Sequence, residues 1–327
     1  MPLDHYVSQV HLKKFYSPAL GNRVYAIRKA DLKAFTPDSQ SVCRVMDGST
    51  NSYLRMDRMI EDFLKMIEPN YNRALSKLTT GEIDSDSIFT IAGFVAYILT
   101  CSPAGMRIQS IPLKQMIEHK TAMMDAKGDF SPPPAMLGGK GLTELLQDGD
   151  VEVVIDQKYP QAVGIASIMK LINIFGNCQW EILHNCSIDS PFFTSDFPVA
   201  IEETSDPRVL NRIVPLTPNL AVRIKPDISI DRDQVDPSFP KFSWVRRHIL
   251  HSDVAKINTL LVRCAEDTVF YRDNHHWIEP FIRKNRYYRI EVCNEKLITG
   301  AGTILFSTQK VVAAVPLPGQ AGASTTA

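Results

Sequence analysis

The chain has 327 residues, of which 44% are apolar, so it can bury a sizeable core and is not expected to be disordered. Its 36 lysine and arginine residues balance 36 aspartate and glutamate residues, which weighs against a dedicated nucleic-acid-binding protein. No two of the six cysteines have CxxC spacing. The N-terminus lacks a basic and apolar signal segment, and the longest apolar run, 88–101, is shorter than the roughly 20 residues that span a membrane. We therefore expect a cytoplasmic protein with reduced thiols and no membrane contact.

The first half of the chain is predicted to be mainly helical, up to about residue 176. Apolar residues recur at helical spacing from Met56 to Leu78, where Pro69 predicts either two helices or a kink. The stretch 130–141, rich in proline and glycine, is the best candidate for a hinge or mobile segment. Further helices are expected at 8–16, 87–101, 105–126 and 159–176, and a strand at 23–28 with a partner at 41–45.

From residue 178 the apolar pattern changes to the alternation of strands. The fold class that follows is α+β, with a largely helical N-terminal part packed on a mixed, mostly antiparallel C-terminal sheet. We expect one composite domain over 1–264, closing strands of the same sheet within 265–315, and a disordered tail at 316–327. Strands are expected at 179–184, 192–201, 213–216, 220–224, 287–292 and 303–306, with one helix at 254–266.

Two motifs at opposite ends of the chain carry a family resemblance. The first is His5-Tyr6-Val7-x-Gln9-x-x-Leu12-x-x-Phe15, and the second is Phe193-x-Ser195-Asp196-x-Pro198, followed by Pro215-Leu216 and a helical Asn258. In this order the chain resembles the domain-of-unknown-function 4238 family, whose signatures are His-Tyr-Val-Pro-Gln and Thr-Ser-Asp-Asn-Pro. The likeness runs from residue 5 to about residue 264. Because that family has no settled activity, the resemblance implies positions and not a mechanism.

The chain departs from the family pattern at two positions. Ser8 stands where the first signature has proline, which is a mild change because both residues start helices well. Phe197 replaces the polar residue that follows the aspartate in the second signature, which weakens the case for a polar contact there.

His5 and Gln9 are the candidate site residues of the first motif. Imidazole titrates near neutral pH, so His5 is a candidate general acid or base, or a metal ligand. The alternative is a partly buried histidine that ties the N-terminus to the body of the protein. Gln9 lies about one helical turn further on and would orient a substrate or fasten the same helix.

Ser195 and Asp196 are the candidates of the second motif. Asp196 would supply an acid, a base or a ligand, although an aspartate two residues before a proline also fits a structural turn. No GxSxG elbow surrounds Ser195, so it is interpreted as a substrate contact or turn residue and not as a nucleophile. Because the two motifs lie toward opposite ends of the chain, we expect His5 and Asp196 to meet in space.

Four further residues complete the predicted site. Glu61 and Glu68 share one helical face, the arrangement that a divalent metal ion would use, although most such pairs are simply solvated. Arg107 would pair with one of them or bind an anionic substrate. Asn258 sits beside an apolar helical stripe and needs a partner, for which the turn at 193–198 is preferred.

Two other groups of polar residues give weaker indications of a functional site. His248 and His251 have the spacing of a metal-binding pair, but Arg246 and Arg247 beside them would repel a cation. The basic stretch 244–248 contains Trp244 and is interpreted as the rim of a sheet in preference to a phosphate contact.

These residues favour a hydrolase-like enzyme that acts on a phosphate-containing or nucleotide-type substrate. His5 and Asp196 would act as acid and base, Gln9, Arg107, Ser195 and Asn258 would bind substrate, and a divalent metal ion is the one cofactor suggested. The alternative is a non-catalytic module that binds a ligand or a protein and uses the His5 and Asp196 cluster to hold its fold together.

Overall fold

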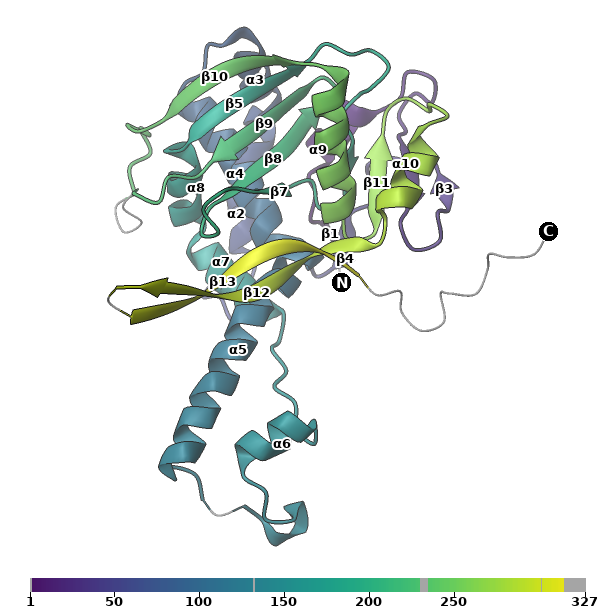
Figure 1. The fold of residues 1–327 in the computed structure, drawn as a ribbon. Helices are drawn as coiled ribbons and strands as arrows, with labels where there is room; N and C mark the ends of the chain where they lie inside the picture. Colours follow the sequence, from purple (N-terminus) through teal and green to yellow (C-terminus); the bar gives the residue numbers. More distant parts are fainter. Residues whose placement is uncertain (1, 132, 230–234, 301, 315–327) are drawn as a thin grey trace, which may run out of the picture.

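The computed structural model describes residues 2–131, 133–229, 235–300 and 302–314, and it has a mixed α+β fold in layers (Figure 1). Its main sheet has the strand order β10-β5-β9-β8-β7. All neighbours pair antiparallel except β10 and β5, which run parallel. The strands are β5 (Gln179–Asn185), β7 (Ala200–Glu203), β8 (Leu210–Thr217), β9 (Leu220–Lys225) and β10 (Ser243–Ile249).

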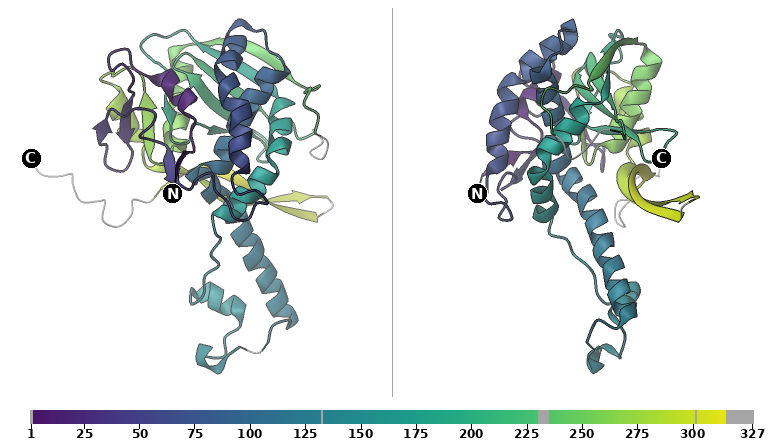
Figure 2. Two further views of the ribbon diagram at one scale, coloured as in Figure 1. Left: turned by 180° about the vertical axis from the view of Figure 1, so that it is seen from behind. Right: turned by 90° about the vertical axis from the view of Figure 1, so that its left-hand side faces the viewer.

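Helices of the first half cover one face of this sheet, and α9 (His251–Cys264) lies on the opposite face (Figures 1 and 2). The central helix α4 (Ser85–Cys101) is buried over most of its length, because its apolar residues point in all directions. Asp84 begins α4 with a capping box, in which its carboxylate accepts from the Ser87 N–H at 3.0 Å. Beside α4 lie α2 (Met59–Ile67), α3 (Tyr71–Thr80), α7 (Lys158–Ala166) and α8 (Ile168–Gly176).

The predicted break at Pro69 is confirmed, because the short 3-10 segment η2 (Glu68–Asn70) separates α2 from α3. The single helix expected at 159–176 is instead two helices, α7 and α8, which are interrupted at Ser167. No proline or glycine stands at this break, so the sequence pattern alone could not predict it.

A second sheet joins strands from distant parts of the chain, with the order β3-β2-β11-β6. It consists of β2 (Tyr25–Arg28), β3 (Ala34–Phe35), β6 (Thr194–Ser195) and β11 (Thr268–Tyr271). The expected pairing of 23–28 with 41–45 is therefore wrong. The segment 41–45 instead overlaps β4 (Arg44–Met46), which pairs with β1 (Leu3–His5). Strands thus occur at both ends of the chain and not only in its second half.

The last strands do not close the main sheet, contrary to the prediction. The strands β12 (Tyr288–Thr299) and β13 (Gly302–Ala313) pair with each other in a separate two-stranded sheet, and β11 belongs to the second sheet. Between β11 and β12 lies α10 (Ile278–Asn285), which the sequence pattern did not predict. The tail predicted to be disordered, 316–327, lies outside the described residues.

A helical arm projects from the body of the protein (Figures 1 and 2). It is made of α5 (Pro103–Lys127) and the shorter α6 (Leu142–Asp148), joined by a connection that includes the 3-10 turn η3 (Ala135–Leu137). Asp125 holds the two together, because its carboxylate accepts from the Thr143 N–H at 3.0 Å. The described residues of the stretch 130–141, which was predicted to be a hinge, lie at the end of this arm, and the mobility of the stretch stays a prediction.

Among the described residues, no single helix is long and apolar enough to cross a membrane. The bent pair formed by Met59–Thr80 and Ser85–Cys101 meets the length and composition criteria only when the two segments are combined.

Candidate functional site

His11, in the short helix α1 (Gln9–Leu12), connects the first motif to the second. Its Nδ1 lies 2.8 Å from the Tyr71 hydroxyl and its Nε2 lies 2.8 Å from the Thr194 Oγ1. The side chain is completely buried against the rings of Phe15 and Phe94. Burial lowers the pKa of His11 to about 3, so the imidazole is neutral in the folded protein. Sequence reasoning missed this residue, although a histidine on the apolar face of the first helix was a signal that it needs partners.

Asp196 holds the turn that links α9 to β11. Its two carboxylate oxygens accept hydrogen bonds from three consecutive backbone N–H groups, those of Glu266 at 3.0 Å, Asp267 at 2.7 Å and Thr268 at 3.2 Å. The side chain is buried, and burial raises the pKa of Asp196 to about 7 against the opposing effect of these donors and of Lys29. The carboxylate therefore already accepts three hydrogen bonds from the backbone of the protein itself.

Lys29 is the buried cation of the same region. Its ammonium group donates to the carbonyl oxygens of Ala265 and of Tyr288, the latter at 2.9 Å. Burial lowers the pKa of Lys29, while the carboxylates around it, first among them that of Asp196, act in the opposite direction. Both residues thus hold the segment 265–268. Asp196 binds its N–H groups, and Lys29 binds one of its carbonyl groups.

Ser195 and Asn258 are completely buried, and their polar groups form hydrogen bonds within the protein. Ser195 Oγ accepts from the Phe197 N–H at 3.1 Å, which is a local turn. Asn258 accepts from the Phe193 N–H at 3.0 Å and donates to the Pro191 carbonyl at 2.9 Å. The expected bond between Asn258 and the second motif is confirmed. These contacts favour a structural role, and a substrate contact by either residue stays a prediction.

Arg107 clamps Glu266 near the base of the arm. Its Nε and one terminal nitrogen each lie 2.9 Å from an oxygen of the Glu266 carboxylate, and the guanidinium also donates to the Ile290 carbonyl at 3.0 Å. A bidentate pair of this kind is among the stronger polar contacts in proteins. Arg107 therefore pairs with Glu266 and Glu291, and the expected pairing with Glu61 or Glu68 is wrong.

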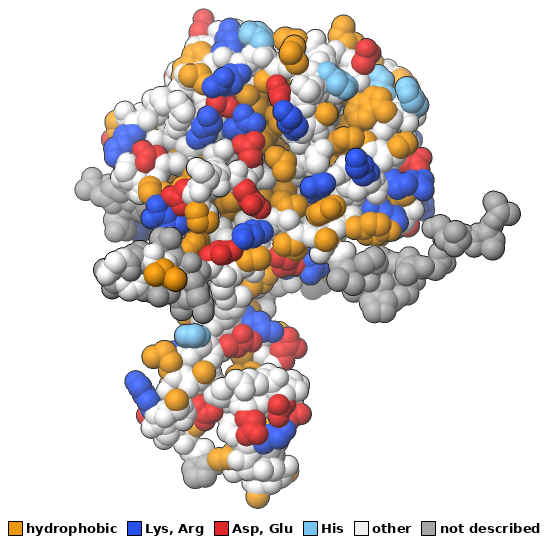
Figure 3. Space-filling model, viewed as in Figure 1, with side chains coloured by type: hydrophobic (Ala, Val, Ile, Leu, Met, Phe, Trp, Pro, Cys, Tyr) orange, Lys and Arg blue, Asp and Glu red, His pale blue; other side chains and the backbone are white. Residues whose placement is uncertain are grey.

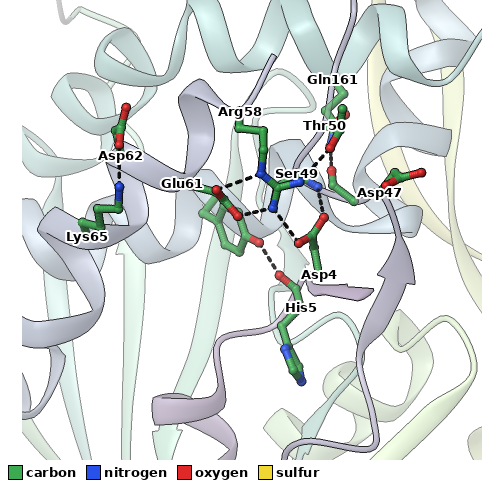
Figure 4. A network of polar contacts seen from close by, with 12 residues as sticks. Asp4, His5, Asp47, Ser49, Thr50, Arg58, Glu61, Asp62, Lys65 and Gln161 are labelled. Carbon is green, nitrogen blue, oxygen red and sulfur yellow. Dashed lines mark hydrogen bonds and ion pairs between the residues drawn. The ribbon is translucent and has the colours of Figure 1, made fainter. Parts of the chain in front are cut away.

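His5 lies at a different place, in a solvent-open hollow of about 200 Å³. Figure 4 shows Arg58 between Asp4 and Glu61 beside it, with the His5 ring directed away from this ion-pair network. The His5 Nε2 atom is buried and has no hydrogen-bond partner among the described residues. The hollow is lined by Leu3, Asp4, His5, Gln9, Ser49, Glu61, Leu64 and Glu68.

The two glutamates predicted to bind a metal ion both have protein partners. Glu61 pairs with Arg58, and Glu68 accepts from the Ser8 hydroxyl at 2.6 Å. Gln9 accepts from the Ser39 hydroxyl at 3.3 Å. Within the described ranges, no three side chains of histidine, cysteine, aspartate or glutamate are placed to hold a metal ion. The hollow therefore brings together His5, Gln9, Glu61 and Glu68 without forming a metal centre of protein ligands.

No hydrogen bond joins His5 to Asp196 among the described residues, and Asp196 does not line the hollow that holds His5. The first motif contacts the second through His11 and Thr194 instead. A catalytic pair made of His5 and Asp196 stays a prediction.

A second polar hollow, of about 270 Å³, lies between α9 and the main sheet, and sequence reasoning did not predict it. At its floor Glu181 is 3% exposed, and Arg223 at 2.6 Å, Lys225 at 2.6 Å and Arg247 at 2.9 Å all pair with it. Burial would raise the pKa of Glu181, but the hydrogen bonds from Lys225 and Arg223 outweigh it and lower the pKa to about 2. The carboxylate is therefore charged at neutral pH.

Figure 3 shows the same face of the molecule, with basic and acidic side chains gathered over the main sheet beside α9. Arg247 and Lys256 reach the solvent, with side chains 57% and 77% exposed. From the sequence, the stretch 244–248 was interpreted as a sheet rim in preference to a phosphate contact. The placement of α9 over the sheet turns part of that rim into one wall of a cleft, which we call the sheet cleft. It is lined by Glu181, Leu183, Glu202, Arg223, Arg247, Ile249, Asp253, Lys256, Ile257 and Leu260.

The fold and these sites define a mixed α+β protein whose two sequence motifs are joined by buried polar contacts, with open polar hollows elsewhere. The family model described as "Protein of unknown function (DUF4238)" matches residues 4–275, so the chain belongs to this family. A search of curated proteins and a search of solved structures each found no match.

Proposed function

We propose that the protein binds a phosphate-bearing small molecule, of the nucleotide type, in the sheet cleft. The observation that carries the proposal is a cluster of cations at the cleft, where Arg223, Arg247 and Lys256 line the hollow beside the carboxylates of Glu181, Glu202 and Asp253. Arg223, Lys225 and Arg247 converge on the single carboxylate of Glu181. One carboxylate balances one of these charges, and Glu202 balances a second through its ion pair with Arg223 at 3.0 Å.

The exposed cations are the ones that a ligand would meet. Arg247 is held by one bond to Glu181 and is more than half exposed, so its remaining N–H groups face the solvent side of the cleft. Lys256 pairs only loosely with Asp253, at 3.2 Å, on the surface of α9. Surface pairs of this kind are worth little, so an anion with several oxygens can displace them.

The cleft also provides apolar surface beside these charges. Leu183 and Ile249 lie on the sheet side, and Ile257 and Leu260 lie on the α9 side. Ligand sites typically combine apolar walls with a few polar groups that orient the ligand. A volume of about 270 Å³ would hold a phosphate group together with part of an organic moiety.

The test is calorimetric titration of the purified protein with ATP, ADP and inorganic pyrophosphate at low ionic strength. We expect binding to weaken by about tenfold in Arg247→Gln, because one charge-assisted contact is worth about 1.4 kcal/mol. Arg246→Gln is the matched control, since Arg246 is the next residue on the same strand and bonds to the Thr79 carbonyl away from the cleft. Absence of binding to all three ligands, or equal loss in both variants, would refute the proposal.

A second candidate function is hydrolysis at the His5 hollow, which is lined by His5, Glu61 and Glu68 and where the His5 Nε2 atom has no partner among the described residues. Because this Nε2 atom is shielded from solvent, His5 can act as a base only when its ring turns into the hollow. The acidic lining of the hollow disfavours a phosphate group there, so a neutral or cationic substrate fits it better. His5→Ala should abolish hydrolysis of such substrates and leave the melting temperature within a few degrees of wild type. Activity that persists in His5→Ala would exclude this candidate.

A further inference from the structure

A cysteine and two histidines meet at the ends of the parallel strands β5 and β10. His184 and His248 are directly paired in the register of these strands, and their ring centroids lie 5.4 Å apart. Cys186 follows two residues after His184, and its Sγ lies 3.6 Å from the His248 Nδ1. Because side chains alternate along a strand, this cluster faces away from the sheet cleft, which Leu183 and Arg247 line.

Cys186 differs from the other five cysteines in its surroundings. It is exposed, whereas Cys293 is half-buried. The remaining four, Cys43, Cys101, Cys178 and Cys264, are buried, and burial raises the pKa of each of their thiols. The thiolate is the reactive form of cysteine, so only Cys186 combines solvent access with a nearby proton acceptor.

The two histidines have different roles in this cluster. Burial, followed by the charge of Arg246, lowers the pKa of His184. Its Nε2 atom is buried and has no hydrogen-bond partner within the described part of the chain. His248, whose Nδ1 lies 3.6 Å from the Cys186 Sγ, is the group that faces the thiol and can take its proton.

We propose that Cys186 is a modification site that undergoes thiol–disulfide exchange with low-molecular-weight disulfides, with His248 as its proton acceptor. The Cys186 proton moves to the His248 Nδ1, and the resulting thiolate attacks one sulfur of the disulfide. The disulfide bond breaks as the new bond to Cys186 Sγ forms. The departing thiolate takes the proton from His248, so atoms and charge balance. This proposal is independent of ligand binding in the sheet cleft.

The test uses the full chain and oxidised glutathione at pH 7, followed by mass spectrometry of the intact protein and of its peptides. We expect a single adduct, located on Cys186 and absent from Cys186→Ser, while Cys293→Ser still forms it. In His248→Asn the rate of adduct formation should fall by about tenfold, because an unassisted thiol is only a few per cent thiolate at this pH. His251→Asn, which changes a nearby exposed histidine, should react like wild type.

A second measurement guards against a His248 variant that does not fold. Cys186 should react faster in the native protein than in the urea-unfolded chain at the same pH, because only the folded state places His248 beside it. An adduct on a different cysteine, an unchanged rate in a folded His248→Asn, or a native rate no higher than the unfolded one would each overturn the proposal.

Discussion

The imidazole of His11 lies 2.8 Å from the hydroxyl of Thr194, although 183 residues separate them in the sequence. This contact joins the N-terminal helix to the strand β6 that begins the second motif. The other ring nitrogen of His11 contacts Tyr71 at the start of α3. One buried side chain thus connects three segments of the chain, and each polar atom in the group has a partner. A neutral imidazole can do this because it carries one donor and one acceptor.

Acid should destabilise the protein through His11. The unfolded chain binds a proton at this residue below about pH 6.5, whereas the folded protein does so only near pH 3. The free energy of unfolding should therefore decrease as the pH falls through this window, by up to about 1.4 kcal/mol per pH unit. In His11→Gln, which keeps a donor and an acceptor but does not titrate, urea denaturation at pH 6.0 and 4.5 should show a smaller difference.

Asp196 contributes to the same pH dependence with the opposite sign. Its pKa is raised to about 7, so its carboxylate costs stability as the pH rises from about 4 to 7. Because Asp196 is present in both wild type and His11→Gln, its contribution cancels in the comparison. If the free energy of unfolding changed equally with pH in wild type and in His11→Gln, His11 would not be held neutral in the folded state.

Removal of the Asp196 carboxylate should destabilise the fold. Asp196→Ala leaves the N–H groups of residues 266–268 without their acceptor and removes the carboxylate that acts most strongly on Lys29, which should cost about 3–5 kcal/mol. Asp196→Asn keeps one carbonyl oxygen and should cost less. Thermal unfolding measures both variants, with the exposed Asp189→Ala as control. If Asp196→Asn kept a near-native melting temperature but lost a hydrolase activity that the wild type shows, the result would instead support a catalytic Asp196.

Arg107 and Glu266 should be energetically coupled. Their bidentate pair is partly shielded from solvent, with side chains 23% and 32% exposed. Single substitutions Arg107→Met and Glu266→Gln should each destabilise the protein, and the double variant should lose less than the sum, with a coupling of about 0.5–2 kcal/mol. Urea denaturation of the four proteins gives this coupling directly. Strict additivity would show that the pair contributes no net stability.

Divalent metal ions should not stabilise the protein through Glu61 and Glu68. Both carboxylates already have partners, and the described ranges contain no third ligand placed with them. Thermal unfolding with millimolar magnesium or stoichiometric zinc, and after dialysis against a chelator, should give melting temperatures that agree within about 1 °C. A saturable increase that disappears in Glu61→Gln would establish a metal site in the His5 hollow.

Local sequence patterns predicted the helices and strands better than they predicted which strands pair with each other. The break at Pro69 and the apolar helix α4 follow from chemistry within a few residues, and both are present, although the residue that caps α4, Asp84, was not predicted. The pairing of Arg44–Met46 with β1, and the separation of β12 and β13 from the main sheet, were not predicted. Register between distant strands depends on which surfaces meet in space, and alternation along one strand does not specify it.

The sequence by itself determined that the polar side chains of the second motif need partners, because they stand within an apolar run and burying them unpaired is costly. The tertiary structure alone decided what those partners are. It gave Asp196 three backbone N–H groups of a turn 70 residues away, and it gave Arg107 the carboxylate of Glu266. It also placed α9 across the main sheet, which formed the sheet cleft from charges that lie far apart in the chain. Hydrogen bonds and ion pairs act over a few ångströms in space, and separation along the chain does not limit them.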